Sequence, residues 1–218
     1  LYLMNRDDIN IFISKLNKLD GIFSLAIWDQ SKETLLVTRD GFGVKPLYYN
    51  SSKYHFSFAS EIKALLPLSR KTNKKISSTL DHSSINRYLT FQFCPGDGTP
   101  INEVKKVNPG EAILVKKGIL NKRITWFRLP GFEKRKEVEK IHNKVELINQ
   151  LEKLLRKSVH NQMISDVPIG AFLSGGLDSS TIVTFAKEKN PDISCFTIDT
   201  KGFEEDGITN DLPYARDV

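Results

Sequence analysis

The spacing of hydrophobic residues changes once along the chain, near residue 144. Before that point, short runs of β-branched and aromatic residues recur between turn signals, a pattern typical of an antiparallel sheet. Segment 111–127 predicts a hairpin that turns at Lys117-Gly118. The first part of the chain is therefore expected to be β-rich. Its clearest strands are predicted at 21–29, 33–40, 46–50 and 54–60.

After residue 144 the apolar residues fall three and four positions apart, which predicts an amphipathic helix over 145–163 with a buried leucine stripe. A short apolar run at 167–173 predicts a buried strand, 178–189 a helix, and 193–200 a second buried strand. Strand, loop, helix and strand in this order are typical of the start of a parallel α/β domain.

These patterns divide the chain into a β-rich part at 1–127, a charged linker at 128–143 and an α/β part at 144–218. With 39% hydrophobic and 27% charged residues in 218, the composition is that of globular protein. The chain opens on Leu1 and stops early in an expected helix, so we expect an internal fragment.

Composition also limits the classes of partner and the cellular compartment that we expect for the chain. No window approaches the run of roughly 18 apolar residues that a membrane span needs, and no signal peptide pattern opens the chain. The net charge is +6, but no aromatic residues interleave with the basic clusters, which disfavours a nucleic-acid partner. Cys94 and Cys195 occur in unrelated contexts, as expected in a reducing compartment. We expect a cytoplasmic protein without membrane or nucleic-acid contacts.

The segment from Ser174 to Ser180, SGGLDSS, joins the first strand of the α/β part to its helix. Unpaired N–H groups and the helix dipole attract phosphate at such a point. Gly175 and Gly176 let the backbone approach an anion, and the hydroxyls of Ser174, Ser179 and Ser180 add donors. Asp178 would repel phosphate unless it reaches Mg²⁺. The alternative is a tight turn in which the serines cap the helix and Asp178 complements the dipole.

The loop lacks the lysine of a Walker A sequence. It resembles instead the S-G-G-x-D-S-S/T loop of the ATP pyrophosphatases, which split ATP between its α- and β-phosphates to adenylate a substrate. The resemblance implies that the loop, Leu177 included, binds ATP and its pyrophosphate. It assigns pyrophosphate oxygens to Ser174, Gly175, Gly176, Ser179 and Ser180, and magnesium to Asp178.

Further motifs resemble one branch of that family. SDVPIG before the loop resembles the asparagine synthetases, and LDGIFSLAIWD, TRDGFGVKPLYY and FASEIKALL resemble, in order, the second half of their glutaminase domain. The implied fold is an α+β N-terminal-nucleophile (Ntn) glutaminase-like β-sandwich portion, followed by the start of an α/β parallel-sheet ATP-pyrophosphatase domain.

The resemblance implies a reaction with ATP, Mg²⁺, aspartate, and glutamine or ammonia. Aspartate is adenylated to β-aspartyl-AMP, and ammonia displaces AMP to give asparagine. In the family the glutaminase nucleophile is an N-terminal cysteine, and neither Cys94 nor Cys195 matches it. We therefore expect no catalytic residue in this chain, no synthesis by the chain alone, and a homodimer as one option for the full-length protein.

Further residues are assigned to an adenine pocket and to the glutaminase part of the chain. Leu173 and the segment Phe196, Thr197 and Ile198 are expected to line the adenine pocket, because nucleotides bind outside the carboxyl ends of such strands. Arg39, Asp40, Ser60 and Glu61 are candidates for the glutaminase interior or the ammonia route, with a structural role as the alternative. The four histidines show no metal-binding spacing. Two other functions stay open: a β-lactam synthetase-like or other carboxylate-adenylating amidotransferase, and a non-catalytic nucleotide-binding module.

Overall fold

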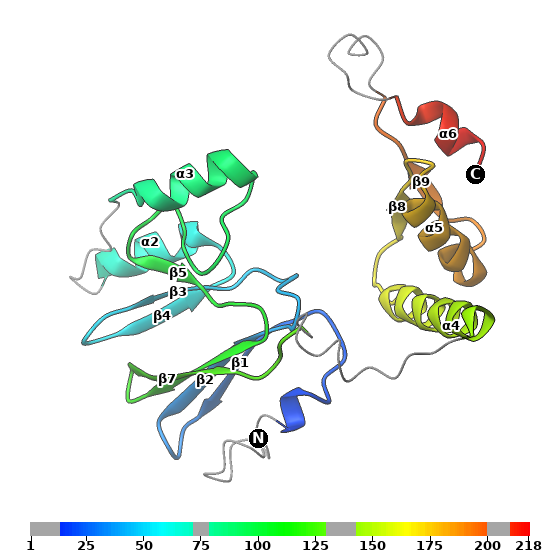
Figure 1. Ribbon diagram of the computed structural model, residues 1–218. Helices are drawn as coiled ribbons and strands as arrows, with labels where there is room; N and C mark the ends of the chain where they lie inside the picture. Colours follow the sequence, from blue (N-terminus) through cyan, green and yellow to red (C-terminus); the bar gives the residue numbers. More distant parts are fainter. Residues whose placement is uncertain (1–13, 72–78, 130–142, 200–209) are drawn as a thin grey trace. The chain divides into compact units, whose positions relative to one another are not determined.

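The computed structural model describes residues 14–71, 79–129, 143–199 and 210–218. Two compact units divide the chain, Leu1–Lys134 and Arg135–Val218 (Figure 1). Most of the predicted linker, 130–142, lies outside the described residues, as do the acidic positions Glu204, Glu205 and Asp206. Within the described ranges, no helix is both long and apolar enough to cross a membrane.

The first unit is built on a four-stranded antiparallel sheet in the order β1-β2-β6-β7. The predicted hairpin is present, and its turn uses Lys117 and Gly118 at φ of 49° and 75°. Both angles lie in the left-handed region, which is why a glycine suits this turn. The four strands are β1 (Ser24–Asp29), β2 (Thr34–Arg39), β6 (Glu111–Lys116) and β7 (Ile119–Thr125).

A second antiparallel sheet has the order β4-β3-β5, formed by β4 (Phe56–Ala59), β3 (Tyr48–Ser51) and β5 (Val104–Lys106). The two sheets share one buried cluster, in which Val37 and Ile113 of the first sheet meet Tyr49 of the second. This is the sandwich that the sequence predicts, because alternate residues of each strand point into one shared core.

Helices flank the second sheet in Figure 1. Helix α2 (Ile62–Lys71) places Leu65 in a cluster with Val104 of β5. Helix α3 (His82–Phe91) begins at Asp81, whose carboxylate accepts hydrogen bonds from the Ser83 and Ser84 N–H groups. The outer face of the first sheet is buried as well, in a cluster of Leu16, Leu36, Ala112 and Trp126.

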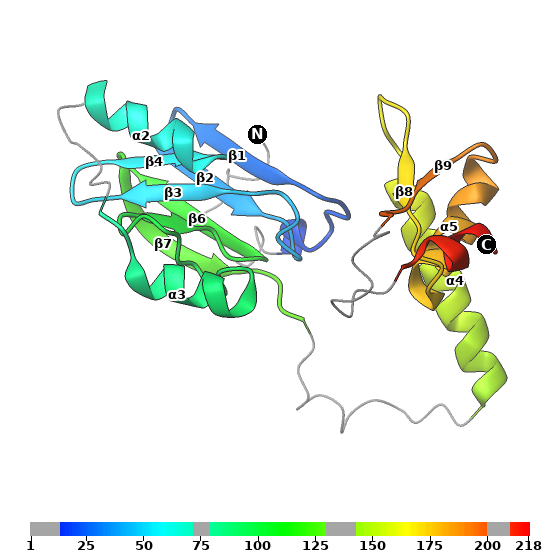
Figure 2. The ribbon, with the colours of Figure 1, turned by 90° about the horizontal axis from the view of Figure 1, so that it is seen from above.

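The first described element of the second unit is α4 (Lys144–Gln162), which Asn143 caps. Strands β8 (Gly170–Phe172) and β9 (Ser194–Phe196) are parallel, and α5 (Leu177–Lys189) connects them (Figure 2). A short helix, α6 (Leu212–Arg216), follows near the end of the described chain. The predicted order of strand, loop, helix and strand is confirmed.

The predicted burial of this unit is wrong. In α4, Leu151 is 58% and Leu154 66% exposed, and in β8, Phe172 is 80% exposed. The physical reason is geometric: among the described elements α4 packs mainly on α5, and a two-stranded sheet cannot cover its own faces. Cys195 in β9 is likewise exposed rather than packed.

Candidate functional site

The predicted phosphate loop follows the carboxyl end of β8 and opens α5. Gly176 is the N-cap of α5, at φ −71° and ψ 162°, and no side chain caps the helix. Within the described chain, the N–H groups of Leu177, Asp178 and Ser179 have no hydrogen-bond partner. Free N–H groups at a helix start form a ready site for an anion.

Two serines fix the shape of the loop. The Ser174 and Ser179 hydroxyl oxygens lie 3.0 Å apart, and the Ser174 N–H donates to Ser179 Oγ at 3.3 Å. Ser179 Oγ also donates to the Gly176 carbonyl at 3.2 Å. These bonds hold the loop against the first turn of α5. Ser174 and Ser179 therefore have a structural role in the loop.

Ser180 differs from the other two serines. Among the described residues, its Oγ is the only buried side-chain oxygen or nitrogen without a hydrogen-bond partner. A buried hydroxyl left unpaired costs about 1–3 kcal/mol. A tight turn that merely caps its helix gives no reason for such a cost.

Gly175 has φ of +77°, a conformation that favours glycine. A Cβ at this position would lie 2.4 Å from the carbonyl carbon and 2.5 Å from Cβ of Tyr214 in α6. The glycine therefore admits α6 as well as the sharp turn. Sequence reasoning missed this neighbour, since no pattern in the chain relates Tyr214 to a loop nearly forty residues earlier.

Asp178 is exposed in the first turn of α5, and within the described chain its carboxylate has no hydrogen bond or ion pair. No group of three metal-ligating side chains occurs among the described residues. A single carboxylate beside a phosphate site fits Mg²⁺, which keeps several waters and takes its other ligands from phosphate. The residues present thus fit the magnesium that the sequence predicts.

The residues assigned to adenine lie at the end of β9, next to the start of the loop. The Leu173 N–H donates to the Phe196 carbonyl at 2.9 Å, and Thr197 Oγ1 donates to the Leu173 carbonyl. Leu173 is buried, while Phe196 and Ile198 are 57% and 72% exposed. The structure brings these four residues together at the expected edge, and their contact with a base stays a prediction.

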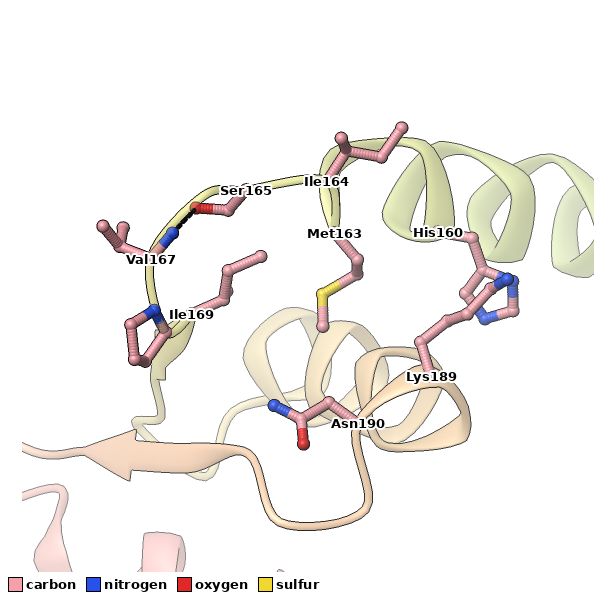
Figure 3. A pocket seen from close by; sticks show the side chains of 9 residues that line it. His160, Met163, Ile164, Ser165, Val167, Ile169, Lys189 and Asn190 are labelled. Carbon is pink, nitrogen blue, oxygen red and sulfur yellow. Dashed lines mark hydrogen bonds between the residues drawn. The ribbon is translucent and has the colours of Figure 1, made fainter.

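A pocket of about 350 Å³ lies at the other end of β8 (Figure 3). Its lining includes His160, Met163, Ile169 and Lys189. His160 Nε2 lies 3.0 Å from the Phe185 carbonyl, so this imidazole joins α4 to α5. Because ligands of parallel sheets bind beyond the carboxyl ends of strands, this pocket is not the candidate nucleotide site.

Arg39 and Asp40 organise the turn after β2. Asp40 is 1% exposed, and its carboxylate accepts hydrogen bonds from the N–H groups of Phe42, Val44 and Lys45 at 3.0–3.1 Å. Burial alone would raise its pKa, but the backbone hydrogen bonds outweigh burial and lower it. Arg39 donates to the carbonyls of Gly43, Lys45 and Val107.

Among the described residues, every hydrogen bond of these two side chains is thus with backbone, which favours the structural alternative. Ser60 and Glu61 are exposed between β4 and α2, and Glu61 pairs with Lys63 at 2.6 Å. The glutaminase or ammonia-route role of these four residues stays a prediction.

Comparison with known proteins gives two family matches. Residues 13–126 match the glutamine amidotransferase domain, and residues 150–218 match asparagine synthase. The chain is 35% identical over 193 residues to asparagine synthetase [glutamine-hydrolyzing] 1 of Bacillus subtilis, covering 88% of this chain and 28% of that protein. It is 32% identical over 221 residues to putative asparagine synthetase [glutamine-hydrolyzing] 2 of Methanocaldococcus jannaschii, covering 97% and 40%.

The chain thus spans between 28% and 40% of the length of these two relatives. Among solved structures, it is similar to the glutamine phosphoribosylpyrophosphate amidotransferase of B. subtilis complexed with ADP and GMP. That similarity has 11% identity and a TM-score of 0.34, and it covers 95% of this chain and 42% of the other.

Proposed function

The chain belongs to the glutamine amidotransferase domain family and continues into the start of an asparagine synthase domain, and we propose that it is part of an ATP-dependent enzyme that amidates aspartate. Its fold class is the predicted one, a class II amidotransferase (Ntn-like) portion followed by the beginning of the synthase domain. The reaction, its substrates and its magnesium are the proposal.

One observation carries the proposal: the loop from Ser174 to Ser180 ends in unpaired backbone donors at the start of α5, where a helix terminus binds anions. The N–H groups of Leu177, Asp178 and Ser179 are free within the described chain. Donors fixed in advance stabilise charge that grows on a leaving group without reorganising during the reaction. These donors would stabilise the pyrophosphate released when the aspartate carboxylate attacks the α-phosphorus of ATP.

Other residues of the site would bind the metal ion and the adenine base. Asp178 would hold Mg²⁺, which neutralises phosphate charge when bound. Leu173 and Phe196 would contact adenine at the end of β9. In the second step ammonia attacks the acyl carbon, and AMP leaves. In this proposal neither cysteine is the glutaminase nucleophile, because neither matches the N-terminal cysteine that the resemblance implies: Cys94 follows α3 and Cys195 lies in β9.

The test is binding of inorganic pyrophosphate to the 218-residue chain by titration calorimetry, with and without Mg²⁺. We expect magnesium-dependent binding that ATP competes away and that Asp178→Ala weakens at least about tenfold. The matched control is Asp192→Ala, which removes an exposed aspartate just after the other end of α5. Equal affinity of wild type and Asp178→Ala would contradict the assigned role.

The acceptor is tested separately, by exchange of labelled pyrophosphate into ATP in the protein that contains this chain. We expect exchange that requires aspartate. Labelled pyrophosphate enters ATP when it attacks the acyl adenylate, and that intermediate forms only when the acceptor acid is present. Exchange that requires a different carboxylic acid would replace aspartate in the proposal. Absence of exchange with any acid, despite tight binding, would favour a nucleotide-binding module.

A further inference from the structure

The hairpin between β3 and β4 places three polar side chains in a chain of hydrogen bonds. Ser52 Oγ lies 2.6 Å from His55 Nδ1, and His55 Nε2 lies 2.8 Å from Asn50 Oδ1. Asn50 is 3% exposed, while Ser52 and His55 are half-buried. All three line a pocket of about 790 Å³ in the first unit.

The hydrogen bonds determine where the protons are. Asn50 Nδ2 donates to the Glu103 carbonyl at 2.7 Å, so the amide oxygen must be the atom that faces His55. That oxygen accepts only, and His55 Nε2 must therefore carry the proton. In the neutral imidazole Nδ1 is then a bare acceptor, to which the Ser52 hydroxyl donates.

This arrangement matches the geometry of an activated nucleophile. A hydroxyl within 2.6–3.2 Å of a base, with the base oriented by a third group, is the general signature of nucleophilic catalysis. The order Ser, His and Asn parallels the Cys-His-Asn arrangement of papain-like proteases. Lys105 lines the same pocket, and its ammonium group is the donor that we assign to a developing oxyanion.

We propose that Ser52, His55 and Asn50 form a second reactive site, at which small carboxylic esters acylate the Ser52 hydroxyl. Ser52 Oγ attacks the carbonyl carbon, and its proton passes to His55 Nδ1. The bond from that carbon to the alcohol oxygen breaks, and the alcohol leaves with the proton. Water then attacks the acyl carbon, His55 takes the water proton, and the acid departs as Ser52 regains its hydrogen.

A purely structural role is the competing explanation. The Ser52 N–H donates to the His55 carbonyl at 2.9 Å, and the Tyr54 N–H donates to Ser52 Oγ at 3.2 Å. Both bonds stabilise the turn whether or not the hydroxyl reacts. The two explanations differ in reactivity alone, so reactivity has to be measured.

The chain contains a matched control. Ser31 lies in the turn between β1 and β2, and its Oγ donates to Asp29 Oδ1 at 2.7 Å. It is a hairpin serine with a side-chain acceptor but no imidazole base. If the base activates Ser52, Ser31 in the same molecule must stay unreactive.

The experiment treats the 218-residue chain with a fluorophosphonate probe, which forms an Oγ–P bond and releases fluoride, and locates the label by mass spectrometry. We expect labelling at Ser52 at least about 100-fold faster than at Ser31, the scale that general base catalysis supplies. Ser52→Ala should remove this label. His55→Gln, whose amide can still hydrogen bond but cannot take the proton, should slow labelling of Ser52 about 100-fold.

Circular dichroism of each variant separates loss of reactivity from loss of the fold. The comparison of Ser52 with Ser31 in the unmodified chain needs no variant, so it decides even if the variants unfold. Equal labelling of the two serines, or an unchanged rate in folded His55→Gln, would overturn the proposal. Hydrolysis of p-nitrophenyl acetate that depends on Ser52 would extend the support from labelling to turnover.

Discussion

Replacing Asp40 by asparagine tests whether the turn after β2 is structural, as its contacts indicate. The carboxylate accepts two N–H groups on Oδ1, from Phe42 and Val44, and one on Oδ2, from Lys45. An asparagine oxygen can keep the first two. Its NH₂ group then faces the Lys45 N–H, so two donors meet and one is left unpaired.

The magnitude follows from these bonds. An unpaired buried donor costs about 1–3 kcal/mol, and the two remaining bonds lose the strength that the negative charge gives them. We therefore expect Asp40→Asn to lower the free energy of unfolding of the first unit by about 2–4 kcal/mol. A loss in this range is a large share of the stability of an ordinary domain.

Tryptophan fluorescence during urea unfolding measures this change selectively. The two tryptophans of the chain, Trp28 and Trp126, both lie in the first unit, so the signal reports that unit alone. Asp29→Asn is the control, since Asp29, the half-buried last residue of β1, accepts hydrogen bonds from the Ser31 hydroxyl and the Lys32 N–H in a less buried turn, and it should change stability less. A change below about 0.5 kcal/mol for Asp40→Asn would refute the reasoning.

Three further predictions concern the same units. Because the pKa of Asp40 lies below its ordinary value of 3.8, its stabilisation is complete above that value and is lost as the pH falls through the lower folded pKa. Urea unfolding between about pH 4 and pH 2 should therefore depend on pH more steeply in wild type than in Asp40→Asn. Gly175→Ala should cost about 1–2 kcal/mol from the left-handed backbone and displace Tyr214, which faster amide hydrogen exchange at 212–216 would report. Arg123→Lys removes the two hydrogen bonds from the guanidinium to the buried Glu111 carboxylate and should destabilise the first unit by about 1–2 kcal/mol in the fluorescence assay. If the free energy of unfolding fell by no more than the loss of an exposed ion pair costs, the hydrogen bonds to the buried Glu111 carboxylate would not stabilise the unit as argued.

Local signals predict most of the fold. The hairpin at Lys117-Gly118 forms where predicted because both residues must adopt positive φ, a requirement that the glycine reveals in the sequence. The loop from Ser174 to Ser180 lies between strand and helix as expected, since periodicity on either side defines both elements. Features that depend on a few neighbouring residues are thus predictable from the chain.

Features that depend on distant neighbours are not. The leucine stripe of α4 predicts burial, but burial depends on which elements pack there, and periodicity contains no information on the partner. The contact of Gly175 with Tyr214 arises from packing between segments far apart in sequence. The alignment of Ser52 with His55 depends on the detailed geometry of the turn between β3 and β4, which the strand pattern does not specify.

The central claim is that the loop from Ser174 to Ser180 binds the pyrophosphate part of ATP, and Ser180→Ala tests it most directly. The variant removes a buried hydroxyl that has no partner in the unliganded chain. We predict two changes of opposite sign: the unliganded second unit becomes more stable by about 1 kcal/mol, and magnesium pyrophosphate binds about 10- to 100-fold more weakly in calorimetry. Unchanged affinity for pyrophosphate together with increased stability would contradict the account, because the hydroxyl would then be a packing defect and not a ligand donor.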